Sequence, residues 1–276
     1  APVHRVLVSN EAARGVVLED GSEMRARSVV SAINPKLLFL KLIGREHLPG
    51  DVVERMTRYR CGSATLRMNV ALSELPALPG LGPGQHPEHG SGIILGPSLG
   101  YMDEAWRDAR TMGWSRQPVI EMLIPSTLDS SLAPPGSHVA SLFCQHFAPE
   151  LPDDRPWSEA RDEVADLVID HVTTFAPNFR DAIVGRMVLT PDDLETRLGL
   201  VGGDIFHGAL GVDQLFSARP ILGHGDYRGP LTGLYLSGAG THPGGGVTGV
   251  PGHNTAAAVL RDLPVLTRLR RRLSRA

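Results

Sequence analysis

The first 45 residues follow the period-two pattern of apolar and polar positions that is typical of short strands. Residues 2–9 and 15–18 are strand candidates, and Asp20-Gly21 between strand-like segments indicates a tight turn. Residues 24–32 then form a third strand candidate. We therefore predict a three-stranded meander, which is too small to have a core of its own and needs another element to pack on.

The middle of the chain mixes strand and helix patterns. The clearest helix covers residues 157–176, where Trp157, Ala160, Val164 and Val168 recur at helical spacing and Pro177 ends the pattern. Pro35 can start another helix, and Thr190 can cap one over residues 191–197. Further helices are predicted at 51–60 and 102–112, strands at 63–72, 92–95, 119–124, 138–147 and 183–189, and an exposed loop at 76–91.

The last quarter of the chain reads as a buried strand over 234–239, a glycine-dense loop, and a helix that carries Ala256 to Leu260. A basic helix is predicted from Pro264 onward. We predict two domains from this organisation. Residues 1–45 and 200–276 form one of them together, and residues 46–199 form the other, as a mixed sheet with covering helices.

Composition narrows the class of protein. Of 276 residues, 42% are hydrophobic and 21% are charged, which is typical of a globular protein. The net charge of −3 argues against a general nucleic-acid binder. No segment approaches the ~20 apolar residues of a membrane span. Two cysteines are too few for a disulfide scaffold or a structural zinc site, so we expect a reducing compartment and a cytoplasmic location.

The glycine-dense loop between strand and helix indicates close approach of the backbone to an electron-rich ligand. Glycine removes the Cβ barrier, and the first N–H groups of the following helix are unpaired donors at its positive end. A dinucleotide fingerprint requires G-x-G-x-x-G directly after the strand. The spacing here is Gly238-x-Gly240-x-x-x-Gly244, and the matching letters from Gly244 to Gly249 lie behind Pro243. We therefore predict a ligand site without a pyrophosphate fingerprint.

Several other signals have a structural interpretation beside the functional one. Ser98 lies in a G-x-S-x-G sequence, either as a hydrolase nucleophile or in a Gly-Pro turn, and we favour the turn. His242 is either a catalytic base or a loop residue that holds backbone groups, and we favour the latter. The histidines lack metal-ligand spacing, so we predict no metal site. The basic cluster at 268–272 either contacts anionic lipid or forms a solvated helix face, and we favour the solvated face.

Three segments together resemble one known family. Residues 233–252 read GLYLSGAGTHPGGGVTGVPG, residues 202–208 read GGDIFHG and residues 29–35 read VVSAINP. The first is similar to the C-terminal flavin-binding signature of phytoene desaturase-type FAD oxidoreductases. The other two, with Asp213 to Phe216 and Arg219-Pro220, resemble one branch of that family. The matches lie at both ends of the chain in collinear order.

The resemblance implies an α/β (α+β mixed) fold, as the C-terminal portion of a two-domain FAD-binding flavoprotein with a mixed-sheet substrate domain. It places residues 238–241 beside the ribityl chain and pyrophosphate, and residues 247–250 at the N1/C2=O edge of the flavin. It makes Phe206 and His207 substrate-facing. Related amine oxidases often have an acidic residue where this chain has Ala239. The implied cofactor-binding residues are Gly238, Ala239, Gly240, Thr241, His242, Gly245, Gly246, Val247, Thr248, Gly249 and Val250.

The chemistry implied by the resemblance is hydride removal from a C–H bond of a hydrophobic small molecule to flavin N5. The sequence itself identifies no catalytic residue. Because the N-terminal fingerprint of the family is absent, we expect this chain alone to bind FAD poorly and to need the other half of the FAD domain. Two alternatives stay open: a non-enzymatic partner-binding module with the flavoprotein fold, and an amine oxidase-type flavoenzyme.

Overall fold

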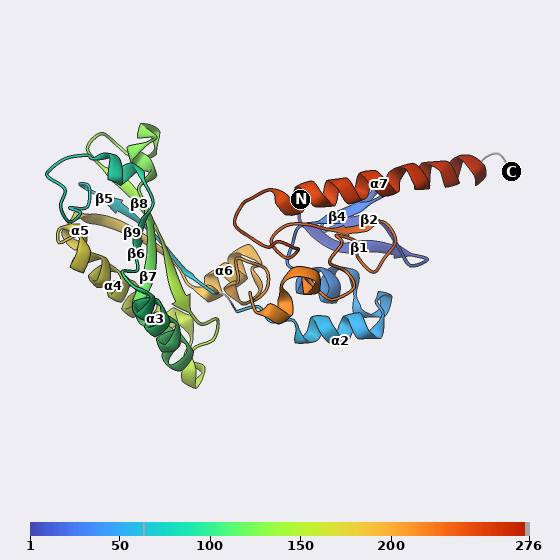
Figure 1. Cartoon of the computed structure of the whole chain (residues 1–276), viewed down its shortest axis with the longest axis horizontal. Helices are drawn as coiled ribbons and strands as arrows, with labels where there is room; N and C mark the ends of the chain where they lie inside the picture. The colour runs from blue at the N-terminus through green and yellow to red at the C-terminus, as the bar shows by residue number, and fades with distance from the viewer. Residues whose placement is uncertain (63, 274–276) are drawn as a thin grey trace. The chain divides into compact units, whose positions relative to one another are not determined.

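The chain divides into two compact units in a computed structural model, which describes residues 1–62 and 64–273, with side chains up to Leu263. The first unit combines Ala1–Cys61 with the chain from Ile205 onward, and the second is Gly62–Asp204 (Figure 1). The sequence placed the boundaries near 45 and 200. Residues 46–61 pack with the first unit instead, because Val52 and Met56 are buried in its core.

The first unit contains two small sheets. Antiparallel strands β1, β2 and β3 form one, and β4 pairs in parallel with β10 to form the other. Its elements are β1 Val3–Ser9, β2 Ala12–Leu18, β3 Glu23–Arg25, β4 Val29–Ser31, α1 Pro35–Leu37, α2 Gly50–Arg58, β10 Leu234–Leu236 and α7 Val250–Leu273.

The single strand predicted at 24–32 is wrong. It is two strands in different sheets, because β3 continues the meander whereas β4 pairs with β10, some 200 residues later in the chain. The Val29 N–H already donates to the Gly233 carbonyl at 2.8 Å. Long-range pairing therefore decides where the second strand begins.

The helix predicted from Pro35 is confirmed, with one irregularity. The Asn34 side chain caps it by accepting the Lys36 N–H at 2.9 Å, and Pro35 occupies the first turn. The three residues of α1 continue as a π-helical turn over Leu38–Ile43, which buries Phe39. This segment leads directly out of β4, so it lies beside the end of the β4–β10 pair.

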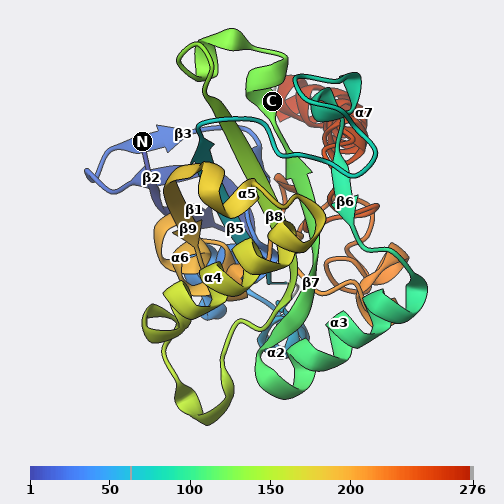
Figure 2. The same cartoon turned by 90° about the vertical axis from the view of Figure 1, so that its left-hand side faces the viewer.

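The second unit is built on a five-stranded antiparallel sheet in the order β6-β7-β8-β5-β9. Helix α4 crosses one face of this sheet (Figure 2). The elements are β5 Leu66–Leu72, β6 Ile93–Leu95, α3 Leu99–Met112, β7 Trp114–Leu123, β8 His138–Phe147, α4 Trp157–Phe175, α5 Phe179–Ala182, β9 Ile183–Leu189 and α6 Pro191–Leu198.

Alternation along the strands produces the core of the second unit. In β5, Leu66, Met68 and Val70 are buried against α4, whereas Arg67 and Asn69 point to the opposite face. The strands predicted at 138–147 and 183–189 and the long helix at 157–176 are confirmed. The strand predicted at 119–124 begins earlier, at Trp114, and the one predicted at 63–72 begins later, at Leu66. Thr190 caps α6 as predicted, because its side chain accepts the N–H of Asp193.

The predicted exposed loop at 76–91 is partly ordered by a buried histidine. His89 is only 2% exposed. Its Nδ1 accepts the His86 N–H at 3.1 Å, so its Nε2 donates to the Pro76 carbonyl at 2.9 Å. A short 3₁₀ turn over Pro87–Gly90 accompanies this contact. Within the described part of the chain, no helix has the length and apolar character needed to cross a bilayer.

Candidate functional site

The glycine-dense loop begins where β10 ends, in the first unit. All three residues of β10 are buried, and the Ser237 N–H continues the parallel ladder by donating to the Ser31 carbonyl at 2.8 Å. The chain then turns at Gly238, which has φ of 74°. A Cβ there would lie 2.8 Å from the carbonyl oxygen of Ala32. The turn out of the strand therefore requires glycine.

Two further glycines allow close contact with neighbouring segments. A Cβ on Gly240 would lie 2.6 Å from the ring of Pro35, and one on Gly245 would lie 2.7 Å from the ring of Phe206. Between them, the hydroxyl of Thr241 donates to the Gly238 carbonyl at 2.9 Å. The loop is thus packed against the helix that follows β4 on one side and against residue 206 on the other.

A buried arginine joins this loop to the second glycine-flanked segment. The side chain of Arg219 is fully buried, and its guanidinium donates to the carbonyl of Ala239 at 2.7 and 3.0 Å. It also donates to the carbonyls of Phe206, Gly208 and Gln214. Main-chain carbonyl oxygens accept all the hydrogen bonds that the Arg219 guanidinium donates. Arg219 therefore fixes the backbone of three separate segments around one point.

Phe206 and His207, the two residues that the family resemblance makes substrate-facing, lie beside the loop. The hydroxyl of Tyr59 donates to the His207 carbonyl at 2.8 Å, and the next residue, Gly208, has no space for a Cβ beside that tyrosine ring. The structure brings both residues next to the 239–245 backbone. Their orientation toward a substrate stays a prediction.

His242 is held as a loop residue. Its carbonyl accepts the hydroxyl of Tyr227 at 3.1 Å, and its ring lies 6.0 Å from that of Phe216. The same tyrosine oxygen accepts the side-chain amide of Asn254 at 2.7 Å, which connects the loop to α7. These contacts show how the loop is positioned and assign no proton transfer to the imidazole.

The tip of the loop and the start of α7 form an open surface of backbone. Gly246 and Gly249 have positive φ, and Val247 is fully exposed. A Cβ placed on Gly249 or Gly252 would meet nothing within 4 Å. The Val250 N–H donates to the hydroxyl of Thr248 at 3.3 Å, at the positive end of a 24-residue helix.

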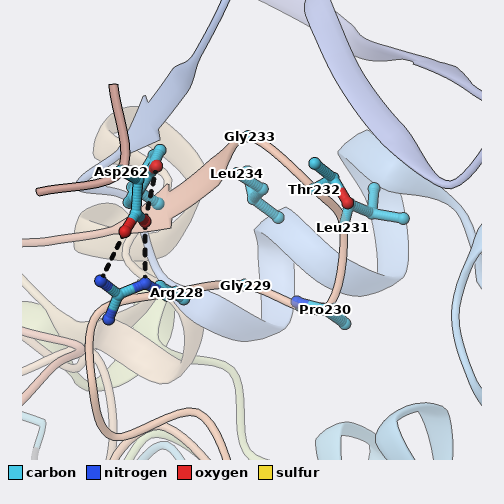
Figure 3. Close-up of a pocket in the computed structure, with 9 residues that line it drawn as sticks. Arg228, Gly229, Pro230, Leu231, Thr232, Gly233, Leu234 and Asp262 are labelled. Atoms are coloured by element: carbon cyan, nitrogen blue, oxygen red, sulfur yellow. Dashed lines mark hydrogen bonds and ion pairs between the residues drawn. The ribbon is translucent and has the colours of Figure 1, made fainter. Parts of the chain in front are cut away.

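A polar cluster anchors the middle of α7 to β10 (Figure 3). Arg228 donates two hydrogen bonds of 2.9 Å to the carboxylate of Asp262, and the hydroxyl of Tyr235 donates to the same carboxylate at 2.9 Å. Hydrogen bonding from Arg228 lowers the pKa of Asp262, and burial raises the pKa of Tyr235 to about 12. These groups line a cavity of about 370 Å³ with Pro230 and Leu231.

Thr255 completes the anchor nearer the helix start. Its buried hydroxyl lies 2.8 Å from the carbonyl of Leu236 and 2.6 Å from that of Pro251. The predicted cofactor residues lie along one loop and the start of α7, with Gly240 and Thr241 buried and residues 246–250 exposed. The resemblance to the family included Arg219-Pro220 but gave Arg219 no role, and the sequence did not reveal Tyr227 or the pair Arg228–Asp262. The burial and the partners of these side chains depend on distant segments, so their role could not be read from the local sequence.

The other candidates from the sequence have separate outcomes. Ser98 is the N-cap of α3, with its hydroxyl accepting the Tyr101 N–H at 3.1 Å. Among the described residues, no group of three or more metal-ligating side chains has the geometry to hold a metal ion. The side chains of the basic cluster at 268–272 lie outside the described residues.

Comparison with known proteins identifies relatives along almost the whole chain. It is 44% identical to pyridine nucleotide-disulfide oxidoreductase domain-containing protein 2 of Mus musculus, over 95% of this chain and 46% of that protein. It is 25% identical to the phytoene desaturase (lycopene-forming) of a Paracoccus species, over 95% of the chain and 50% of the relative. The chain thus spans about half the length of the curated relatives it matches. No protein-family model matches it.

Solved structures show the fold. An oxidoreductase from Methanosarcina mazei superposes with a TM-score of 0.57 at 15% identity, over 94% of this chain and 48% of that one. The mixed α/β architecture therefore matches roughly half of a flavoprotein oxidoreductase fold, and the fold class predicted from the sequence is confirmed.

Proposed function

We propose that this chain, which belongs to the phytoene desaturase-like family of oxidoreductases, forms the flavin-edge part of an FAD-dependent enzyme. The proposed reaction is the removal of hydride from a C–H bond of a hydrophobic substrate. One observation carries this proposal: the exposed segment from Gly246 to Gly252 contains the start of a long helix and has open space in front of Gly249 and Gly252.

The residues of this segment fit the flavin end of FAD better than its pyrophosphate end. A pyrophosphate cradle needs glycines at fingerprint spacing directly after the strand, and here they lie later in the loop. The open space in front of Gly249 and Gly252 admits a flat ring edge. When bound there, FAD supplies the hydride acceptor, and the protein supplies position and electrostatics.

The chain's own residues then have separate tasks. The turn at Gly238 to Thr241 lies beside the ribityl chain in this proposal, and Arg219 holds its backbone through the Ala239 carbonyl. The start of α7 stabilises negative charge at the flavin N1/C2=O edge by roughly 0.3–2 kcal/mol. Phe206 and His207 border the substrate side of the flavin.

FAD affinity after a single substitution tests the proposal. Gly252 has no neighbour within 4 Å of a Cβ position and no positive φ, so Gly252→Leu disturbs nothing within the chain. Because the added side chain would occupy the proposed flavin space, we expect at least a tenfold loss of FAD affinity. Gly82→Leu is the matched control, since Gly82 is equally open and lies in the second unit.

The protein for this titration is a chimera in which the chain replaces the aligned half of the mouse relative, because the chain spans only about half of it. Flavin absorbance and fluorescence quenching give the affinity. A Gly252→Leu chimera that binds FAD as tightly as the unmodified chimera contradicts the proposed placement. Stoichiometric FAD on the chain alone contradicts the expectation that a second segment is needed.

A further inference from the structure

The face of the five-stranded sheet away from α4 carries an unusual row of side chains. The strand registers align five residues across it in the order Leu189, Arg67, Phe143, Glu121 and Ile94. Directly opposed residues of antiparallel strands point to the same face. A cation and an anion therefore lie on either side of a phenylalanine, in the middle of an otherwise apolar row.

Arg67 has no carboxylate partner in the described part of the chain. Its Nη2 donates to the hydroxyl of Ser141 at 3.1 Å, and its guanidinium lies 5.3 Å from the ring centroid of Phe143. By contrast, Arg116 on the same sheet forms an ion pair of 2.8 Å with Asp108. The Arg67 guanidinium therefore keeps donors available on a half-buried surface, where charge is screened less than in water.

Glu121 does not pair with Arg67 in the described part of the chain. The two residues lie on strands separated by β8, so about 10 Å separates their backbones. Glu121 also forms no ion pair among the described residues. Its charge repels an anion from its own side of Phe143 and so favours placement of an anion at Arg67.

Exposed apolar side chains lie on the same face as Arg67, beside the polar residues Asn69 and Ser141. Met187, on the strand next to that of Arg67, is 47% exposed, and Leu123 and Ile94, on more distant strands, are 44% and 64% exposed. Phe143 and Leu189 flank Arg67 directly. Together with Arg67, these apolar side chains are suited to a ligand with one anionic end and one apolar body.

We infer that this open face binds an amphipathic carboxylate, with Arg67 as the residue that recognises its acidic group. The planar guanidinium can donate two parallel hydrogen bonds to a carboxylate, and Phe143 and Met187 contact the apolar chain. The inference goes beyond the proposed function, because it assigns a binding site to the second unit alone.

Calorimetric titration of the full chain with decanoate, below its micelle concentration, tests this inference. We expect saturable binding of decanoate and none of decyltrimethylammonium. Arg67→Leu should weaken decanoate binding by at least tenfold, and Arg67→Lys by a smaller factor, because lysine keeps the charge without the planar fork. Arg116→Leu is the matched control and should leave the affinity unchanged.

A photoreactive decanoate analogue locates the ligand independently of any variant. We expect mass spectrometry to find its cross-links in residues 66–72 and 138–147. Cross-links confined to other segments, no decanoate binding, or equal affinity of the Arg67→Leu chain each overturn the inference. Arg67-dependent binding together with failed FAD binding by the chimera would contradict the proposed function and leave this binding site in place.

Discussion

The two units stabilise their sheets in different ways. In the second unit, five antiparallel strands direct one set of alternating side chains into a continuous core under α4. In the first unit, β4 and β10 form a parallel pair of only three residues each, and Val30 of β4 is 54% exposed. Parallel sheets in proteins are normally buried on both faces. The first unit therefore relies on other contacts around its short sheet.

The first unit has an apolar core that includes Phe39 and Leu234, and polar contacts add to it. Arg219 binds the main chain of three segments, and Asp262 joins α7 to β10 through Arg228 and Tyr235. The candidate site is in this unit. The stability of the second unit therefore depends mainly on apolar burial. The shape of the candidate site in the first unit depends on a few individual polar residues.

The largest expected effect comes from Arg219→Met. Several buried carbonyls lose their donor at once, each at a cost of about 1–3 kcal/mol, so we expect a loss of about 3–5 kcal/mol in the first unit. Trp106, Trp114 and Trp157 all lie in the second unit, so their fluorescence reports that unit alone. Far-UV circular dichroism in denaturant should shift while the tryptophan transition stays in place.

The control for Arg219→Met is Arg55→Met. Arg55 is an exposed arginine of the same unit that donates to a single carbonyl, so we expect a change within about 0.5 kcal/mol. A tryptophan transition that moves as far as the circular dichroism would show that the two units do not unfold separately.

A core substitution should affect the other unit. Leu142 is fully buried in β8, and Leu142→Ala leaves a cavity that costs about 2–5 kcal/mol. We expect the tryptophan fluorescence transition to move to lower denaturant. Leu128→Ala is the control, because Leu128 is largely exposed. If the two variants behave alike, apolar burial is not what stabilises this unit.

A smaller effect is expected from Asp262→Asn, which removes the charge but keeps the shape. Because the carboxylate is partly exposed, we expect a loss of about 1 kcal/mol, measured as faster hydrogen exchange in α7. The pKa of Asp262 is lowered in the folded protein, so its contribution is present above its ordinary pKa and is lost as pH falls through the lowered value. Asp226→Asn should change exchange less, since Asp226 is the more exposed partner of Arg228.

The smallest effect is expected from Tyr101→Phe in the second unit. The hydroxyl of Tyr101 donates to the Pro118 carbonyl at 2.8 Å and accepts a hydrogen bond from His171 Nε2 at 2.6 Å, so its removal should cost about 0.5–1.5 kcal/mol.

Burial lowers the pKa of His171 in the folded protein, so the unfolded chain binds a proton more readily. Stability of the unit should therefore fall as pH drops below the ordinary histidine pKa, and tryptophan fluorescence at several pH values checks this.

Much of the second unit was predictable because its signals are local. Helical spacing identified α4, strands were predicted with the observed bounds of β8 and β9, and Thr190 marked the start of α6. Each of these patterns depends on residues within one or two turns of each other. The failure at residues 24–32 has the opposite cause, since a partner far along the chain divides that segment into β3 and β4.

The sequence by itself determined that a glycine-rich turn follows a buried strand and precedes a helix. Glycine spacing and apolar runs are local patterns of consecutive residues, so they can be recognised without the fold. Only the tertiary structure decided what holds that turn. Arg219 reaches Ala239 and Phe206 from separate segments, and Asp262 reaches Arg228 across 34 residues. Whether a charged side chain is buried, and which carbonyl or carboxylate it meets, depends on segments that only folding brings together.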